Sequence, residues 1–317
     1  MLLSIRHVTE LAYDRRISES VMQLRMVPRS DSHQTLRGFG LAIGPSAPVF
    51  EHVDWLGNRV HQFSVVDFHD RLVILAHSAV EMHASAIDLD RVDDPFPLER
   101  PDAWRHHDYL QLEGPLRPDP RLDELIGALE LREATRAREV LDAVTMRLGD
   151  HLAYRKGVTT SATDVSTVLD QGAGVCQDFA HLGIALLREV GIPARSVSGY
   201  LGRRGDDVEL ETHAWLEAHL PSAGWVALDP THRVRPDRHH VAIAVGRSFA
   251  DVPPNRGVYR GDASERIAVR VRMEEVEEVP RGLLAPRAAM LEVPTFAGVA
   301  DARHREAIDY QQEQQQQ

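Results

Sequence analysis

The first part of the chain alternates apolar and polar residues in short runs that end at turn residues. Such alternation is typical of half-buried strands. The clearest pair covers residues 49–55 and 59–65, with Leu56-Gly57-Asn58 between them as a predicted hairpin turn. Further strands are predicted at residues 3–13, 21–27, 40–44 and 73–83. The pattern therefore predicts a β-rich, sandwich-type domain over residues 1–95.

A proline-rich segment follows this alternating region. Six prolines occur among charged residues, at positions 95, 97, 101, 115, 118 and 120. Proline fixes its own φ angle and has no N–H to donate, so this composition favours an extended linker. We therefore expect a linker at residues 96–120 and a domain boundary there.

Beyond the linker the apolar period changes to that of a helix. Leu122, Leu125, Ile126 and Leu129 have helical spacing, and a second such run covers residues 140–148. Another helix is predicted to start near Cys176 and to end at Gly191-Ile192-Pro193. Strands are then predicted at 194–201, 212–220, 225–228, 241–245 and 266–274. Helices followed by antiparallel strands predict an α+β domain over residues 121–280. Residues 281–317 are expected to form a tail whose glutamine-rich end is disordered.

Composition narrows the classes of function. Lys and Arg number 36 and Asp and Glu 48, which gives a net charge of −12. This balance argues against non-specific nucleic-acid binding. The single cysteine excludes an intramolecular disulfide and zinc sites built from several thiolates. The N-terminal residues lack the apolar core of a signal peptide, and no apolar run is long enough to span a membrane. The sequence therefore predicts a cytoplasmic protein without a membrane partner.

Histidine pairs are the remaining candidates for a metal site. His106-His107 and His239-His240 are adjacent residues, whose side chains diverge, and neither pair has the spacing of ligands on a helix. We interpret them as surface histidines and expect no metal and no cofactor.

Cys176 is the strongest candidate for chemistry. It follows a loop with two glycines, Gly172 and Gly174, and precedes an apolar helix. The free N–H groups and the dipole at a helix start favour an anion, which predicts a lowered pKa for the thiol. The alternative is a buried cysteine that acts as a small apolar side chain.

A thiol nucleophile needs a base, and the base needs an orienting group. On a strand, His213, Trp215, Glu217 and His219 share one face, and His213 is placed to project into a cleft. Asp229 ends the apolar run 225–228, where its carboxylate would reach an imidazole on the neighbouring strand. The alternatives are a solvent-facing histidine and a simple Asp-Pro turn.

These residues occur in blocks that resemble the transglutaminase-like superfamily. The blocks cover residues 172–181, 191–195, 198–200, 212–215 and 225–231, and the segments 7–13 and 24–29 resemble the N-terminal domain of bacterial members. The resemblance spans about residues 1–280. It implies a papain-like core with Cys176 as nucleophile, His213 as base and then acid, and Asp229 as orienting carboxylate. The implied chemistry forms a thioester from an amide and passes the acyl group to water or an amine.

The groups around this set are less determined. The Cys176 N–H is a candidate oxyanion donor, and Tyr154, in the block 152–159 that also resembles the family, is a candidate second donor or a packed tyrosine. Gln171 and Trp215 are further candidates for contact with substrate. The chain has no Asp-rich loop with calcium-binding spacing, so calcium activation is not expected. Peptides, proteins and small amides all fit as substrates. The alternative function is a non-catalytic binding module that keeps the fold.

Overall fold

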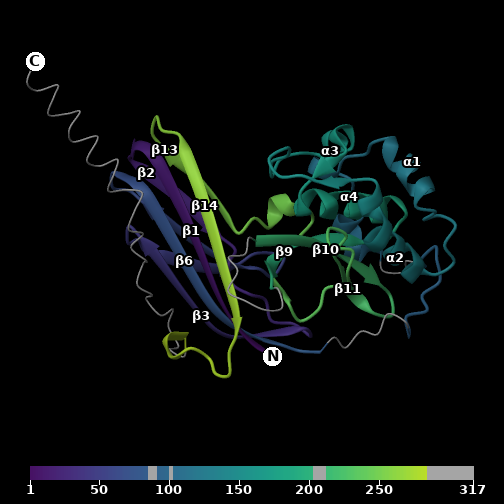
Figure 1. Ribbon diagram of the computed structural model, residues 1–317, viewed down its shortest axis with the longest axis horizontal. Coiled ribbons are helices and arrows are strands. Elements are labelled where there is room, and N and C mark those ends of the chain that lie inside the picture. The colour runs from purple at the N-terminus through teal and green to yellow at the C-terminus, as the bar shows by residue number, and fades with distance from the viewer. Residues whose placement is uncertain (85–90, 100–102, 203–211, 284–317) are drawn as a thin grey trace, which may run out of the picture.

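The computed structural model describes residues 1–84, 91–99, 103–202 and 212–283. Long strands form one side of the molecule, and helices with a shorter sheet form the other (Figure 1). The four-stranded sheets of the two units are antiparallel. This confirms the predicted α+β organisation with a β-rich N-terminal part. Among the described residues, no helix combines the length and the apolar character needed to cross a membrane.

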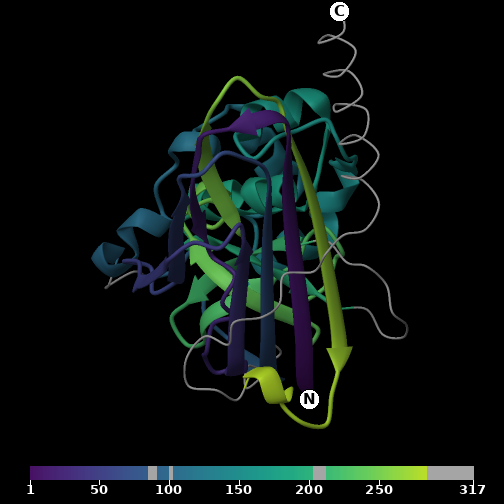
Figure 2. The same cartoon turned by 90° about the vertical axis from the view of Figure 1, so that its left-hand side faces the viewer.

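The N-terminal unit is a sandwich of two four-stranded sheets. One sheet has the order β14-β1-β6-β3 and the other β13-β2-β5-β4. The N-terminal strands are β1 (Leu2–Ile17), β2 (Glu19–Leu24), β3 (Gln34–Gly44), β4 (Val49–Val53), β5 (Arg59–Val65) and β6 (His69–Met82). Apolar residues from both sheets meet in one buried cluster that includes Leu11, Leu24, Phe63 and Ile74. The long strands of the first sheet lie side by side in Figure 2. Alternation along the strands thus gives each sheet its buried face.

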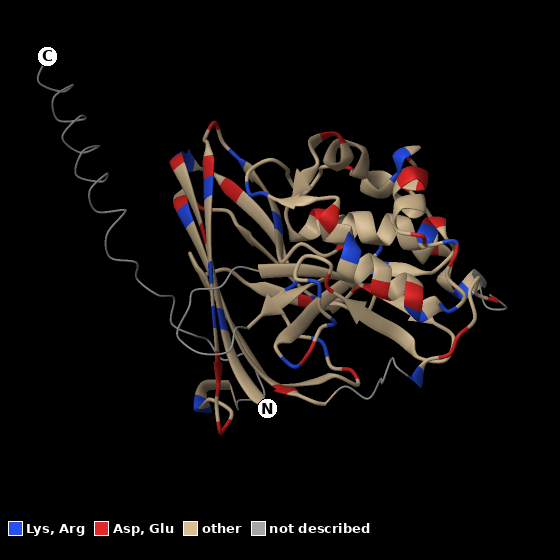
Figure 3. Cartoon of the chain, turned by 45° about the vertical axis from the view of Figure 1, so that its right-hand side comes forward, with Lys and Arg blue, Asp and Glu red and all other residues tan. Residues whose placement is uncertain are grey.

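Two strands of this sandwich come from the far end of the chain. These are β13 (Asn255–Arg260), which pairs with β2, and β14 (Glu265–Glu275), which pairs with β1 from Leu3 to Tyr13. The strand near 266–274 was predicted, but its grouping with the second unit was wrong. Alternation marks a strand without naming its partner, and here the partners are the open edges of β1 and β2. The mostly exposed β14 carries charges of both signs, which suit an edge strand (Figure 3).

The proline-rich segment packs on the second unit instead of extending into solvent. Its described residues form two 3-10 turns, η2 (Ala103–Tyr109) and η3 (Gly114–Leu116). Leu116 is buried in the core of the second unit, and Phe96, Leu98 and Leu112 pack against that core. The predicted extended conformation is therefore wrong here, because burial of these apolar side chains outweighs the preference of proline for an extended chain.

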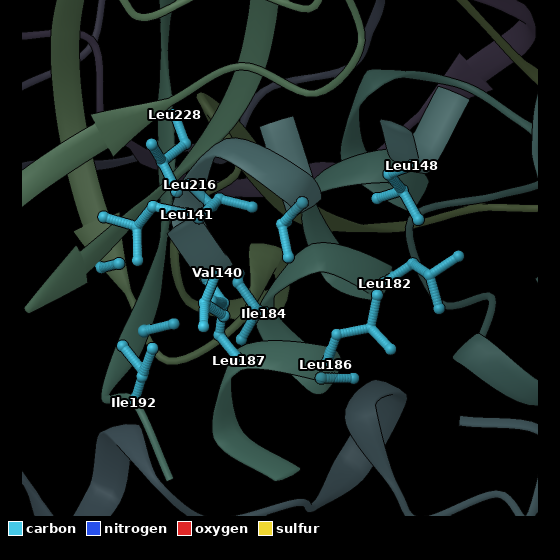
Figure 4. Packing of buried hydrophobic residues seen from close by; sticks show 14 of the residues in the cluster. Val140, Leu141, Leu148, Leu182, Ile184, Leu186, Leu187, Ile192, Leu216 and Leu228 are labelled. Carbon is cyan, nitrogen blue, oxygen red and sulfur yellow. The ribbon is translucent and has the colours of Figure 1, made fainter. Parts of the chain in front are cut away.

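The second unit packs helices on one face of a four-stranded sheet. Its helices are α1 (Arg121–Ala128), α2 (Ala137–Arg147), α3 (Val165–Gln171) and α4 (Cys176–Glu189). The sheet has the order β11-β10-β9-β12, from β9 (Ala194–Leu201), β10 (Thr212–Leu220), β11 (Gly224–Leu228) and β12 (His240–Gly246). Leu216 and Leu228 of the sheet meet side chains of α2 and α4 (Figure 4). A Cβ on Gly183 would lie 2.5 Å from Leu216, so glycine permits this close approach of α4.

The sandwich is attached to the open edge of the core sheet. β12 pairs with β9 on one side only. The buried amide of Asn58 accepts from the N–H of Val245 and donates to its carbonyl, both at 2.9 Å. Gln34 forms the same pair of bonds with Ala242, at 2.8 and 2.9 Å. Two side-chain amides thereby satisfy backbone groups that a neighbouring strand would otherwise take.

Candidate active site

A short loop places Cys176 at the start of α4, as the sequence predicted. α3 ends at Gly172, whose φ of 57° lies in the left-handed region that glycine favours. β8 (Ala173–Gly174) then pairs with β7 (Ala153–Tyr154). The buried carboxylate of Asp178 accepts the N–H of Val175 at 2.7 Å and the hydroxyl of Thr159 at 2.6 Å. Asp178 thus fixes the residue that precedes the cysteine.

The thiol of Cys176 lies beside the strand that carries His213. The backbone N–H groups of Ala214 and Gln177 lie close enough to the thiol to lower its pKa. Burial raises the pKa of the thiol to about 11, although these two N–H groups lower it. The predicted lowering of the thiol pKa is therefore wrong, because the desolvation of Cys176 outweighs the helix start. At neutral pH the resting group is a thiol.

His213 and Asp229 form a buried pair. The Nε2 atom of His213 lies 2.8 Å from Oδ2 of Asp229, and the two side chains are 8% and 0% exposed. An ionised carboxylate only accepts hydrogen bonds, so Nε2 carries a proton and donates it. Nδ1 of a neutral ring is then left as the acceptor. The sequence predicted this pairing from Asp229 at the end of the strand next to His213.

Two further histidines, His232 and His240, also contact Asp229. His232 was not singled out in the sequence, and the interpretation of His240 as a surface histidine is wrong, because its side chain is buried. His232 approaches Oδ2 through Nδ1 at 2.8 Å, and His240 approaches it through Nε2 at 3.3 Å. Burial alone would raise the pKa of Asp229, but hydrogen bonds from His213, His232 and His240 hold it well below its usual range. The backbone N–H groups of Thr231 and His232 donate to Oδ1. Asp229 is therefore a strongly held anion.

The histidine pair 239–240 divides between two environments. His239 contacts the carboxylate of Asp237 at the surface, whereas His240 is buried and turns to Asp229. Adjacent side chains do diverge, as expected, but the second one enters the site. In the sequence the two residues differ only in that His240 begins the apolar run 240–246, all of which is buried in β12.

The other predicted residues occupy different positions. Tyr154 is 51% exposed and pairs with Gly174 in the parallel bridge next to the cysteine loop. Gln171 is exposed at the end of α3. Trp215 is buried, and its ring stacks on His213 with centroids 5.9 Å apart. The structure thus brings Trp215 to the histidine and Tyr154 to the cysteine loop.

A cavity of about 530 Å³ lies next to the site. Trp215 and His240 line one side, and residues of the N-terminal unit, among them His33, Gln34 and His83, line another. The cavity is therefore bounded by both units. Its wall shares His240 with the Asp229 cluster.

Two family models match the chain. The model of the transglutaminase-like superfamily covers residues 127–230, and the model of the bacterial transglutaminase-like N-terminal region covers residues 3–81. The first range includes Cys176, His213 and Asp229. The chain belongs to the transglutaminase-like superfamily and carries the N-terminal region of its bacterial members.

Individual relatives agree with this assignment. An uncharacterised protein of Mycobacterium tuberculosis is 32% identical over 278 residues, which cover 80% of this chain and 86% of the relative. A protein-glutamine gamma-glutamyltransferase of Pseudomonas aeruginosa is 34% identical over 174 residues, 50% of this chain and 25% of that enzyme. A crystal structure from Cytophaga hutchinsonii, described as a candidate cysteine protease, has a TM-score of 0.71 at 23% identity. It covers 88% of this chain and 93% of its own, and it shows the shared fold.

Proposed function

We propose that the protein is a thiol-dependent enzyme that cleaves or transfers an amide-linked acyl group through a thioester on Cys176. One observation carries the proposal. His213 and Asp229 form a buried pair joined at 2.8 Å, and the backbone N–H of Ala214, the residue after His213, lies near the Cys176 thiol. This arrangement supports Cys176 as the nucleophile, His213 as the base and Asp229 as the orienting carboxylate.

The first half of the reaction follows from these positions. As the sulfur bonds to the carbonyl carbon, the thiol proton passes to Nδ1 of His213, and Asp229 stabilises the imidazolium through Nε2. The carbonyl electron pair moves to oxygen, which the N–H of Cys176 at the start of α4 stabilises. Collapse of this intermediate breaks the carbon–nitrogen bond. The leaving amine takes the proton from Nδ1 and a thioester remains.

The raised thiol pKa makes this a general-base reaction. A thiol with a pKa of about 11 is almost entirely protonated at neutral pH. Nucleophilic thiolate therefore forms as the proton moves to His213, instead of being present at rest. Reactivity should depend strongly on His213.

Two acyl acceptors, water and an amine, are compatible with the proposed thioester. With water as acceptor the enzyme is a peptidase or amidase, which is our first choice, and substrates would be peptides, proteins or small amides. Acyl transfer to an amine is the second candidate. It is favoured by the 34% identity over 174 residues with a protein-glutamine gamma-glutamyltransferase.

Acylation of Cys176 tests the common step. We expect a p-nitrophenyl ester to acylate the wild-type protein once, at Cys176, as measured by release of nitrophenol and by intact mass. Cys176→Ala should abolish this acylation, and His213→Ala should slow it at least about 100-fold. His219→Ala is the matched control, because His219 lies on the same strand and face, and it should leave the rate unchanged.

Two results would contradict the proposal. Equal acylation rates for His213→Ala and the wild type would remove the base. A wild-type protein that binds peptides but never acquires an acyl group would establish the alternative, a non-catalytic binding module. Addition of hydroxylamine or an alkylamine to the acyl-enzyme then distinguishes transfer from hydrolysis by the mass of the product.

A further inference from the structure

Three imidazole nitrogens converge on one carboxylate oxygen. His213 Nε2, His232 Nδ1 and His240 Nε2 lie 2.8, 2.8 and 3.3 Å from Oδ2 of Asp229. His213, Asp229 and His240 each offer one ligand atom, these atoms all lie within 4.8 Å of one another, and these three residues are buried. A carboxylate oxygen has two lone pairs, so three N–H donors exceed the number it can accept well. The cluster holds more donor atoms than the His213–Asp229 pair requires.

The same atoms form a known kind of metal-binding set. Two imidazole nitrogens and one carboxylate oxygen bind Zn²⁺ at about 2.0–2.2 Å in open, three-ligand sites. Three ligand atoms this close together can surround one ion with only small side-chain movements. One cation in this cluster would replace several competing hydrogen bonds.

Neighbouring groups are arranged to support His240 as a ligand. The N–H of Asp237 lies 3.2 Å from Nδ1 of His240, and Oδ1 of Asp237 lies 3.4 Å from the same atom. Nδ1 can therefore accept from the backbone when Nε2 carries the proton. When a metal takes Nε2, Nδ1 can instead donate to the carboxylate. Such a carboxylate–histidine–metal arrangement orients and strengthens the ligand.

We propose that His213, Asp229 and His240 form a binding site for a divalent transition-metal ion, with Zn²⁺ as the fitting ion. The ligand atoms are Nε2, Oδ2 and Nε2. Binding is a property of these side chains alone. A consequence for catalysis, which rests on the proposed function, is that the bound ion blocks the reaction.

The blocking follows from the two nitrogens of His213. A metal on Nε2 takes the lone pair there, so the single proton of the neutral ring moves to Nδ1. Nδ1 is then a donor and cannot accept the proton of the Cys176 thiol. The metal also takes Oδ2, which removes the bond that orients the ring. The ion would hold the enzyme in a resting state that a chelator reverses.

Calorimetric titration of the metal-free full-length protein with ZnCl₂ tests the site. We expect one site in the wild type, at least about 100-fold weaker binding in His240→Ala, and unchanged binding in His151→Ala, a control histidine on the surface of the same unit. Cys176→Ser should also bind normally. His240→Gln serves as a second variant with a polar side chain, and it should lose affinity without loss of the folded circular-dichroism spectrum.

Cobalt gives an independent spectroscopic readout. Bound Co²⁺ should show visible bands of nitrogen and oxygen coordination without the near-ultraviolet charge-transfer band of a thiolate. The proposal is overturned if His240→Gln binds as tightly as the wild type, if Cys176→Ser loses binding, or if the thiolate band appears. Acylation by the nitrophenyl ester is measured separately. A metal-free protein that is never acylated refutes the proposed function but leaves the metal titration to decide the site.

Discussion

Asp178 lies so close to Gly174 that a methyl group on Gly174 would be 2.6 Å from the Cβ of the aspartate and 2.7 Å from its Oδ2. That oxygen is the one that holds the N–H of Val175. Gly174→Ala should therefore displace Asp178 and shift Cys176. We expect at least about 10-fold slower acylation and a free energy of unfolding lower by about 1–3 kcal/mol, measured by ester turnover and urea unfolding.

Gly127 provides the control for this prediction. It lies in α1, and apart from its chain neighbours and the backbone of its own helix, no atom lies within 4 Å of a Cβ added there. Gly127→Ala should keep the acylation rate and raise the free energy of unfolding by up to about 1 kcal/mol, since alanine favours helix. Unchanged acylation in Gly174→Ala would show that the cysteine loop does not depend on this contact.

A second prediction concerns the charge of Asp229. Asp229→Asn keeps the shape of the side chain but replaces the carboxylate with an amide. In the wild type, three imidazole groups donate hydrogen bonds to that carboxylate. His213 should lose its preferred proton position, so acylation should slow by about 10²–10⁴-fold. The variant should still fold, which circular dichroism can check. Acylation within about 3-fold of the wild type would rule out an orienting role for Asp229.

A third prediction concerns the contact between the two units. Asn58→Asp removes the N–H₂ group that donates to the carbonyl of Val245 and leaves a buried carboxylate beside it. We expect a loss of about 2–4 kcal/mol in the free energy of unfolding, because a buried acceptor is left unpaired and a charge is buried. Gln62→Glu makes the same chemical change on an exposed residue of β5 and should cost less than about 0.5 kcal/mol. Equal losses in urea unfolding of the two variants would refute the role of Asn58.

The core of the site could be predicted because its signals are local. A glycine loop before an apolar helix fixes where Cys176 lies, and strand alternation fixes the face of His213. The end of β11 places Asp229 beside that strand. In each case a few neighbouring residues carry the information, and period and capping rules are sufficient to interpret them.

The rest depends on contacts between distant segments. No local pattern indicates that β14 returns to β1, or that Asn58 and Gln34 bind the edge of β12. His240 reaches Asp229 because β12 pairs with β9, which only the assembled sheet determines. The thiol pKa was mispredicted for a related reason. A helix start is visible in the sequence, but the burial that opposes it comes from tertiary packing.

Buried histidines predict a loss of stability in mild acid. Burial lowers the pKa of His7 and of His181 to about 4. His181 Nε2 accepts the N–H of Phe249 at 2.9 Å, and the ring of His7 bonds to Tyr200 and Thr9. In the unfolded chain a histidine has a pKa near 6.5, so between about pH 6.5 and 4 the unfolded state binds more protons. The free energy of unfolding should therefore fall as the pH drops through this window.

The size of the effect can be measured residue by residue. With these pKa values, linkage gives a loss of roughly 2 kcal/mol for each histidine between pH 7.5 and pH 5. His181→Gln keeps an acceptor for Phe249 but cannot be protonated, so urea unfolding of this variant should lose about 2 kcal/mol less over that range than the wild type. His52→Gln, on an exposed strand residue, should behave like the wild type. If the free energy of unfolding of His181→Gln falls with pH as it does in the wild type down to pH 5, protonation of His181 does not destabilise the fold. The substitution removes only that titratable group.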